Sequence, residues 1–126
     1  MKSVIISAVL AAIMITGALV YTNRLDNVSR NLLEMNESVS EYLKREDYNL
    51  ALAQINTIKE YLEKKHTLLA AMGNHEELDK IEMNISELQK YTEGEMQTDA
   101  LSRCQVLDFL FEHMPKNDYV RLENIL

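Results

Sequence analysis

Residues 3–21 read SVIISAVLAAIMITGALVY, a run without a charged side chain. As an α-helix it would rise about 1.5 Å per residue and extend for roughly 28 Å, close to the thickness of the hydrocarbon core of a bilayer. A secretory signal peptide has a shorter apolar core, followed by small residues at its cleavage site. Here the apolar run continues through residues 19–21, beyond a passable cleavage site near Ala18. We therefore expect residues 1–21 to remain as a transmembrane anchor; cleavage near Ala18, which would release a secreted protein, is the alternative.

The sequence after the apolar run has the spacing of an amphipathic helix. Its apolar residues are alternately three and four positions apart, which places them on one helix face; they are Leu25, Val28, Leu32, Met35, Val39 and Tyr42. No proline interrupts residues 3–44, and only Gly17 weakens the helix. The pattern predicts one continuous helix from about Ser3 to Lys44, in which the membrane segment leads directly into a helix that packs on the rest of the chain.

Three more helices are predicted downstream. Asp47 is a suitable N-cap for the first, which we expect to run over residues 48–72 because residues 73–74, Gly and Asn, tolerate the left-handed conformation that ends helices. The next is expected over residues 75–94, where a glycine closes it. The last is expected over residues 98–115, because a proline ends it.

Each predicted helix has an apolar edge at helical spacing. The edges are Leu52, Ile55, Ile58, Tyr61 or Leu62, Leu68 and Leu69 in the second helix, Leu78, Ile81, Ile85 and Leu88 in the third, and Leu101, Cys104, Leu107, Phe111 and Met114 in the fourth. Short connections make neighbouring helices antiparallel. The predicted fold is all-α: an N-terminal transmembrane helix that continues into an up-down bundle of about four helices, formed by residues 22–126.

The charges argue against one class of partner and indicate an orientation. The chain has 13 Lys and Arg against 20 Asp and Glu, a net charge of −7. An acidic domain repels anionic headgroups and the phosphate backbone of nucleic acids, so we expect no nucleic acid among its partners. Lys2 precedes the apolar run, and the positive-inside bias then predicts a cytoplasmic N-terminus and an extracytoplasmic bundle. We expect a single-pass protein of the cell membrane that contacts lipid through residues 3–21.

Small residues in the apolar run suggest a contact within the membrane. Ser7 and Ala11 form one small-xxx-small pair, and Ala8 and Ala12 form another. Such pairs let two membrane helices approach closely. We expect these four residues to contact a multi-pass membrane protein or a second copy of the chain, although Ala and Ser are also ordinary residues of an apolar helix.

The polar residues give no catalytic or metal signature. Glu63 and His66 form an E-x-x-H pair, but a di-iron bundle uses two such motifs and two further carboxylates. Lys64 and Lys65, between the two residues of the pair, disfavour a cation. The sequence has no G-x-S-x-G turn and no glycine-rich phosphate loop. We therefore predict no catalytic, cofactor-binding or metal-binding residues, and no enzyme activity.

Two further features have a structural and a functional interpretation. His75 and Glu76 lie at a predicted helix start, where acidic side chains complement the helix dipole; the functional alternative is a polar contact with a partner. Cys104 is the only cysteine, so the chain has no internal disulfide. Its position between Leu101 and Leu107 on a helical pattern predicts that the thiol is buried.

Five stretches of the sequence together point to a family. They are MKSVIIS (residues 1–7), REDYNLALAQINTIKEYLEKK (45–65), NHEELDKIEMNISELQKY (74–91), LFEHMP (110–115) and LENIL (122–126). They resemble an uncharacterised bacterial family, domain of unknown function 4363, over essentially the whole chain. The resemblance implies a short membrane-associated protein with a helical remainder. It implies no activity and no site residues.

The sequence thus predicts a membrane-anchored, non-enzymatic interaction or structural module that associates with another membrane protein or with itself. A ligand-sensing bundle that acts through a partner is the alternative from another class. The secreted protein that cleavage near Ala18 would produce is the third possibility considered.

Overall fold

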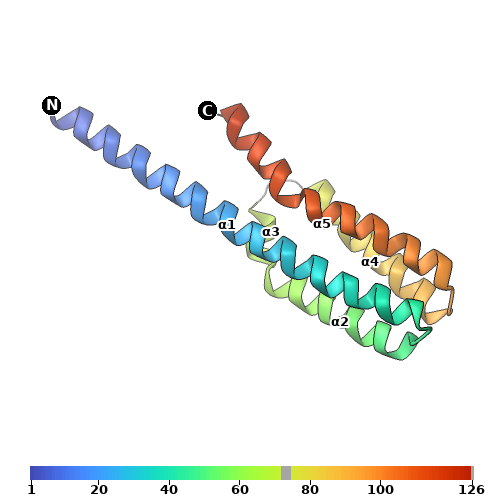
Figure 1. The fold of residues 1–126 in the computed structure, drawn as a ribbon. Helices are drawn as coiled ribbons and strands as arrows, with labels where there is room; N and C mark the ends of the chain where they lie inside the picture. Colours follow the sequence, from blue (N-terminus) through green and yellow to red (C-terminus); the bar gives the residue numbers. More distant parts are fainter. Residues whose placement is uncertain (72–74, 126) are drawn as a thin grey trace.

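The computed structural model describes the backbone of residues 1–71 and 75–125 and the side chains of residues 1–71 and 75–114. These parts of the chain form helices and no strands, which confirms the predicted all-α class. The helices are α1 (Lys2–Lys44), α2 (Tyr48–Lys64), α3 (His66–Ala70), α4 (His75–Glu93) and α5 (Gln97–Ile125) (Figure 1).

Helix α1 has two halves with different surroundings. Its N-terminal half projects from the bundle, on the same side as the end of α5, and reaches beyond the other helices (Figure 1). The large apolar side chains of residues 4–20 are between 49% exposed, at Val20, and 75% exposed, at Met14. Its C-terminal half packs against α2 and α5, and from Leu25 onward it contributes fully buried side chains to the core. The predicted continuous helix from the apolar run into the bundle is therefore present.

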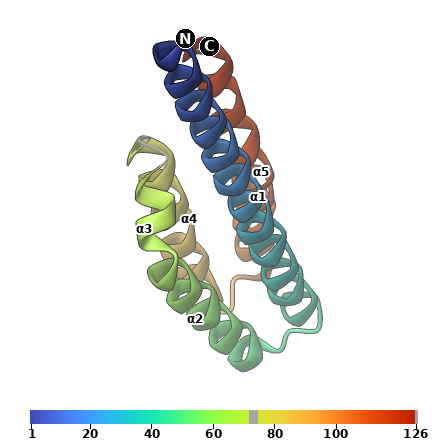
Figure 2. The same cartoon turned by 90° about the vertical axis from the view of Figure 1, so that its left-hand side faces the viewer.

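The bundle consists of α2, α4, α5 and the second half of α1, and successive long helices run antiparallel (Figures 1 and 2). One core cluster joins all of them, together with Leu69 of α3. The third predicted edge is buried throughout, as at Ile81 and Ile85, and the fourth is buried at Leu107 and Phe111 among others, whereas its first residue, Leu101, is only partly buried. The spacing of apolar residues alone therefore identified most of the core.

The buried stripe on α1 differs in register from the prediction. Leu25, Val28, Leu32 and Val39 are buried as expected, but Met35 and Tyr42 are only partly buried at the edge of the core. Asn36 and Leu43 occupy the buried positions instead. The reason is that α1 contacts helices on two sides, α2 and α5, so its buried face is broader than a single row of residues.

The predicted second helix is interrupted. Helix α2 ends at Lys64, and Lys65, with φ −96° and ψ 10°, separates it from the short α3. The break lets α3 turn toward α1, where the Tyr21 hydroxyl donates a hydrogen bond to the Leu68 carbonyl at 3.2 Å. It also buries Leu69. The predicted helix end at residues 72–74 lies outside the described residues.

The predicted stop at Pro115 is wrong, because α5 continues through it to Ile125. Proline has no N–H, so the Phe111 carbonyl, four residues earlier, lacks its usual helical donor. A side chain of α1 takes the place of that donor: Ser29 Oγ donates a hydrogen bond of 2.5 Å to the Phe111 carbonyl. Ser29 is 3% exposed, so this bond is sealed inside the bundle. Beyond this point the last part of α5 diverges from α1 (Figure 1).

Three polar contacts tie α1 to α5 at intervals of seven residues on both helices. They join Ser29 to the Phe111 carbonyl at 2.5 Å, Asn36 Nδ2 to the Cys104 carbonyl at 2.8 Å, and Gln97 Nε2 to the Leu43 carbonyl at 2.9 Å. A seven-residue interval is two helical turns, so the same edge of each helix faces the other throughout. The contacts therefore fix the antiparallel register of this pair.

The two turns at the end of the bundle far from the projecting half of α1 have the same geometry. Each has a glutamate in the left-handed region: Glu46 at φ 60° and Glu95 at φ 55°. In each turn the residue after the glutamate donates its N–H to a carbonyl five residues earlier, which is the Schellman pattern of helix ends. Gly94, expected to close the third helix, lies one position before the left-handed residue. The conformation that favours glycine is thus occupied by glutamate in both turns.

We expect replacement of Ser29 by Ala to lower the free energy of unfolding by about 1–3 kcal/mol, because a buried carbonyl loses its donor. The loss should be smaller in a Pro115→Ala background, where residue 115 regains an N–H for Phe111. Chemical denaturation of the full chain in uncharged detergent micelles would measure both. Ser38→Ala, whose hydroxyl bonds to Glu34 within its own helix at 3.3 Å, is the control; an equal loss in both backgrounds would contradict this role of Ser29.

We expect Glu46→Gly and Glu95→Gly each to raise the free energy of unfolding by roughly 1 kcal/mol, because glycine carries no penalty in the left-handed region. Denaturation under the same conditions would measure the gain. Glu93→Gly, inside the last turn of α4, should instead destabilise by about 1 kcal/mol. If Glu46→Gly and Glu95→Gly were as destabilising as Glu93→Gly, the two turns would not have this geometry.

Candidate functional site

The projecting half of α1 is the largest exposed apolar surface of the described chain. It is long and apolar enough to cross a membrane. Two of its hydroxyl groups bond within the helix: Ser7 Oγ donates to the Ser3 carbonyl at 2.9 Å and Thr16 Oγ1 to the Ala12 carbonyl at 2.8 Å. Such internal bonding is what a polar group needs in a medium without water.

The small-residue pairs lie on this exposed half of α1. Ser7, Ala8, Ala11 and Ala12 are all exposed, so a second helix can reach them. No other helix of the described chain covers them, because the bundle begins further along α1 (Figure 1). The predicted contact within a membrane therefore stays a prediction.

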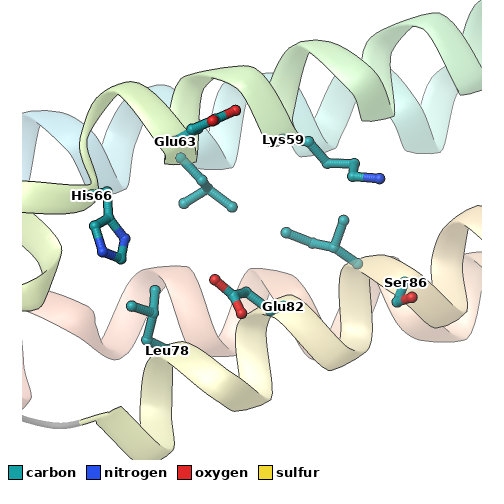
Figure 3. Close-up of a pocket in the computed structure, with 8 residues that line it drawn as sticks. Lys59, Glu63, His66, Leu78, Glu82 and Ser86 are labelled. Carbon is teal, nitrogen blue, oxygen red and sulfur yellow. The ribbon is translucent and has the colours of Figure 1, made fainter.

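A groove of about 350 Å³ lies between α2 and α4 (Figure 3). Its apolar lining includes Leu62 and Leu78, and charged side chains such as Lys59 and Glu82 stand at its rim. This is the region of the E-x-x-H pair. The His66 ring points into the groove, whereas the Glu63 carboxylate points away along α2 (Figure 3).

The groove carries no metal centre in the described residues. Nowhere in the described part of the chain do three His, Cys, Asp or Glu side chains lie close enough to hold a metal ion. His66 and Glu82 share the groove, but Glu63 does not turn toward them (Figure 3). The groove is therefore a candidate only for a small ligand that contacts apolar and charged groups together.

The other predicted polar contact is at the start of α4. His75 and Glu76 are both exposed there, and Glu76 and Glu77 form the acidic first turn of the helix. Acidic groups at this position stabilise the helix by complementing its dipole. The structural interpretation is sufficient for these residues, and the structure does not bring them together with another candidate group in the groove.

A second hollow, of about 480 Å³, lies where α1 leaves the bundle, between α1, the end of α2 and α3. Its polar lining comes from two sides: Arg24, Asn27 and Asn31 on α1, and Tyr61, Lys64 and Lys65 at the end of α2. Three of these six side chains are cations, and no described carboxylate lines the hollow.

Hydrogen bonds and a ring contact hold the walls of this hollow. Asn31 Nδ2 donates to the Tyr61 hydroxyl at 2.9 Å, which joins α1 to α2. The Lys65 ammonium lies 5.8 Å from the centroid of the Tyr61 ring. Sequence reasoning missed the hollow, because the net charge argued against anions and Arg24 is 40 residues from Lys64 along the chain. The adjacent Lys64 and Lys65 were the one local signal.

Comparison with known proteins supports the resemblance found in the sequence. A family model described as a domain of unknown function, DUF4363, matches residues 19–125. The chain belongs to the DUF4363 family. The DUF4363 match covers the bundle and the exit of α1 from it, but only the end of the apolar run. No curated protein and no solved structure matches the chain.

Cys104 of this DUF4363 chain is buried in the core, as predicted. Burial raises the pKa of its thiol to about 11, although a hydrogen bond with Ser40 acts in the opposite direction. The thiolate is the reactive form of cysteine, so a thiol with this pKa stays protonated and unreactive at neutral pH. The side chain serves packing in α5.

We expect the Cys104 thiol of the folded chain to resist alkylation at pH 8, which is well below its pKa of about 11. Unfolding in denaturant should restore ordinary reactivity, because the thiol is then solvated. Mass spectrometry after timed iodoacetamide treatment would measure both states. Complete modification of the folded chain within minutes would show that Cys104 is accessible.

Proposed function

We propose that this chain is a membrane-anchored, non-enzymatic module, in which the first half of α1 spans the bilayer and the rest of the chain forms a helical bundle at one membrane surface. The observation that carries the proposal is the exposure of every large apolar side chain of residues 4–20 on a helix that continues unbroken into the core. Exposed apolar surface of this extent is unfavourable in water and is stable in lipid.

The junction between the two halves supports the same function. Tyr21 is the last residue of the uncharged run, and tyrosine is favoured at the boundary between lipid and water. Its hydroxyl bonds to the carbonyl of Leu68 in α3. The anchor is therefore joined to the bundle by a continuous helix and by a tertiary contact, with no flexible linker between them.

The module would act by association. Its intramembrane helix would contact a multi-pass membrane protein or a second copy through Ser7, Ala8, Ala11 and Ala12. The N-terminus would be cytoplasmic and the bundle extracytoplasmic, in the cell membrane. A ligand-sensing role has one supporting observation, the groove between α2 and α4, and it would also require a partner to carry the signal.

The expected result for the expressed full chain is an intact mass that includes residues 1–18 and retention in membranes after alkaline carbonate extraction. Leu10→Arg together with Ile13→Arg should release it, since an arginine near the middle of a membrane helix costs about 3 kcal/mol. Leu50→Arg with Met83→Arg replaces two exposed apolar side chains of the bundle and should leave retention unchanged.

Recovery of a soluble chain that begins near Leu19 would overturn the proposal in favour of a secreted protein. Equal release of the two double variants would show that the apolar half of α1 is not what holds the chain in the membrane.

A further inference from the structure

Three of the 13 Lys and Arg residues of this acidic chain line one hollow. The chain carries a net charge of −7, yet the hollow beside the exit of α1 is lined by Arg24, Lys64 and Lys65 and by no described carboxylate. Asp26, the acidic residue nearest to Arg24 in sequence, is paired with Arg30 at 2.8 Å instead. The hollow is therefore a local site of positive potential on a protein that otherwise repels anions.

The hollow lies at the depth of lipid headgroups when residues 3–21 span the bilayer. Arg24 follows Tyr21 by three residues, which is about 4.5 Å along a helix axis. The polar layer on each side of the hydrocarbon core is roughly 5–7 Å thick. Helix α2 runs antiparallel to α1, so Lys64 at its C-terminus and the next residue, Lys65, return to the same level. Long cationic side chains extend toward headgroups from such positions.

The walls of the hollow are held before any ligand arrives. The bond between Asn31 and Tyr61 fixes the spacing of α1 and α2. The Lys65 ammonium is placed over the Tyr61 ring. The two lysines at the end of α2 also complement the dipole of that helix. The dipole does not explain Arg24, which belongs to α1 and lines the same hollow. Three cations with nearby amide and hydroxyl groups are suited to a phosphate.

We propose that this hollow binds the phosphate of an anionic phospholipid headgroup. The inference rests on the membrane anchoring proposed above. Binding would fix the rotation of the bundle about the axis of α1, because the cations lie on one side only. The first turn of α4 carries Glu76 and Glu77, so anionic lipid would attract the α1–α2 side and repel the start of α4.

The test uses the full chain in nanodiscs of equal phosphatidylglycerol and phosphatidylcholine, with native mass spectrometry of the lipids that remain bound. We expect phosphatidylglycerol to be retained over phosphatidylcholine by about tenfold, and each cation near an anionic surface to contribute up to about fivefold. The triple variant Arg24→Gln, Lys64→Gln, Lys65→Gln should lose at least fivefold of this preference. The matched control Lys44→Gln, Arg45→Gln, Lys90→Gln removes the same charge away from the hollow and should keep it.

Equal preference in the two triple variants, or no preference in the original chain, would overturn the proposal. A second arm measures thermal unfolding in uncharged detergent with millimolar inorganic phosphate, where we expect no shift. A shift that the Arg24, Lys64, Lys65 variant abolishes would assign the hollow to a soluble phosphate and overturn the lipid source.

Flotation with vesicles of phosphatidylcholine alone separates the two proposals. A chain that floats with these vesicles but shows no headgroup preference would refute only the headgroup site. A chain that does not float with them would refute the anchoring, and with it the lipid source of the phosphate.

Discussion

The first half of helix α1 exposes apolar side chains on every face, whereas its second half must bury one apolar face, and the rest of the structure depends on the continuity between these two halves. Its first half is apolar on every face, and the hydroxyls of Ser7 and Thr16 bond to its own backbone. Its second half is apolar on one face only, and the other helices cover that face. Because one unbroken helix carries both patterns, the bundle lies in line with the apolar half of α1, and the hydrogen bond between Tyr21 and the Leu68 carbonyl joins the two at their junction.

The pairing of α1 with α5 combines apolar packing with buried polar contacts, and the polar contacts carry the specificity. Leucines pack almost equally well after a shift along the helix, whereas a buried serine or asparagine is satisfied in one register. Asn36 illustrates the cost: its amide nitrogen bonds to the Cys104 carbonyl and to Asp108, while its Oδ1 is buried without a partner among the described residues. Ser29 shows the benefit, because it supplies the donor that proline removes from α5.

The helices and most of the core could be predicted because periodic apolar residues report burial directly, as at Ile81, Ile85 and Leu107. The failures share a physical cause. Pro115 ends a helix by local rules, but the hydroxyl of Ser29, 82 positions before Phe111 in the sequence, supplies the donor that the Phe111 carbonyl would otherwise lack. The break at Lys65 accompanies a contact distant in sequence, the hydrogen bond from Tyr21 to the Leu68 carbonyl, and the left-handed glutamates replace the glycine that local rules prefer.

The candidate sites were less predictable than the fold. The cationic hollow is formed by Arg24 and Lys64, which only the antiparallel packing of α1 and α2 brings together, and the average charge of the chain concealed it. The E-x-x-H spacing would put Glu63 and His66 on one face of a single helix, but the break at Lys65 leaves them on α2 and α3, and their side chains point in different directions (Figure 3). The small-residue pairs in the first half of α1 remain predictions, because they concern a surface that only another molecule can cover.

Because α1 is one uninterrupted helix, a change in the tilt of its first half moves the bundle as well. From Tyr21 to Lys44 the helix extends for about 35 Å at 1.5 Å per residue. With the apolar half in a membrane, as proposed, and the bundle moving as one body, a change of 10° in the tilt of that half, within the range seen for single helices, would move the far end of the bundle sideways by about 6 Å. The protein would then work as a lever with its pivot in the lipid, so that a small adjustment among packed membrane helices becomes a large displacement of the turns at Glu46 and Glu95.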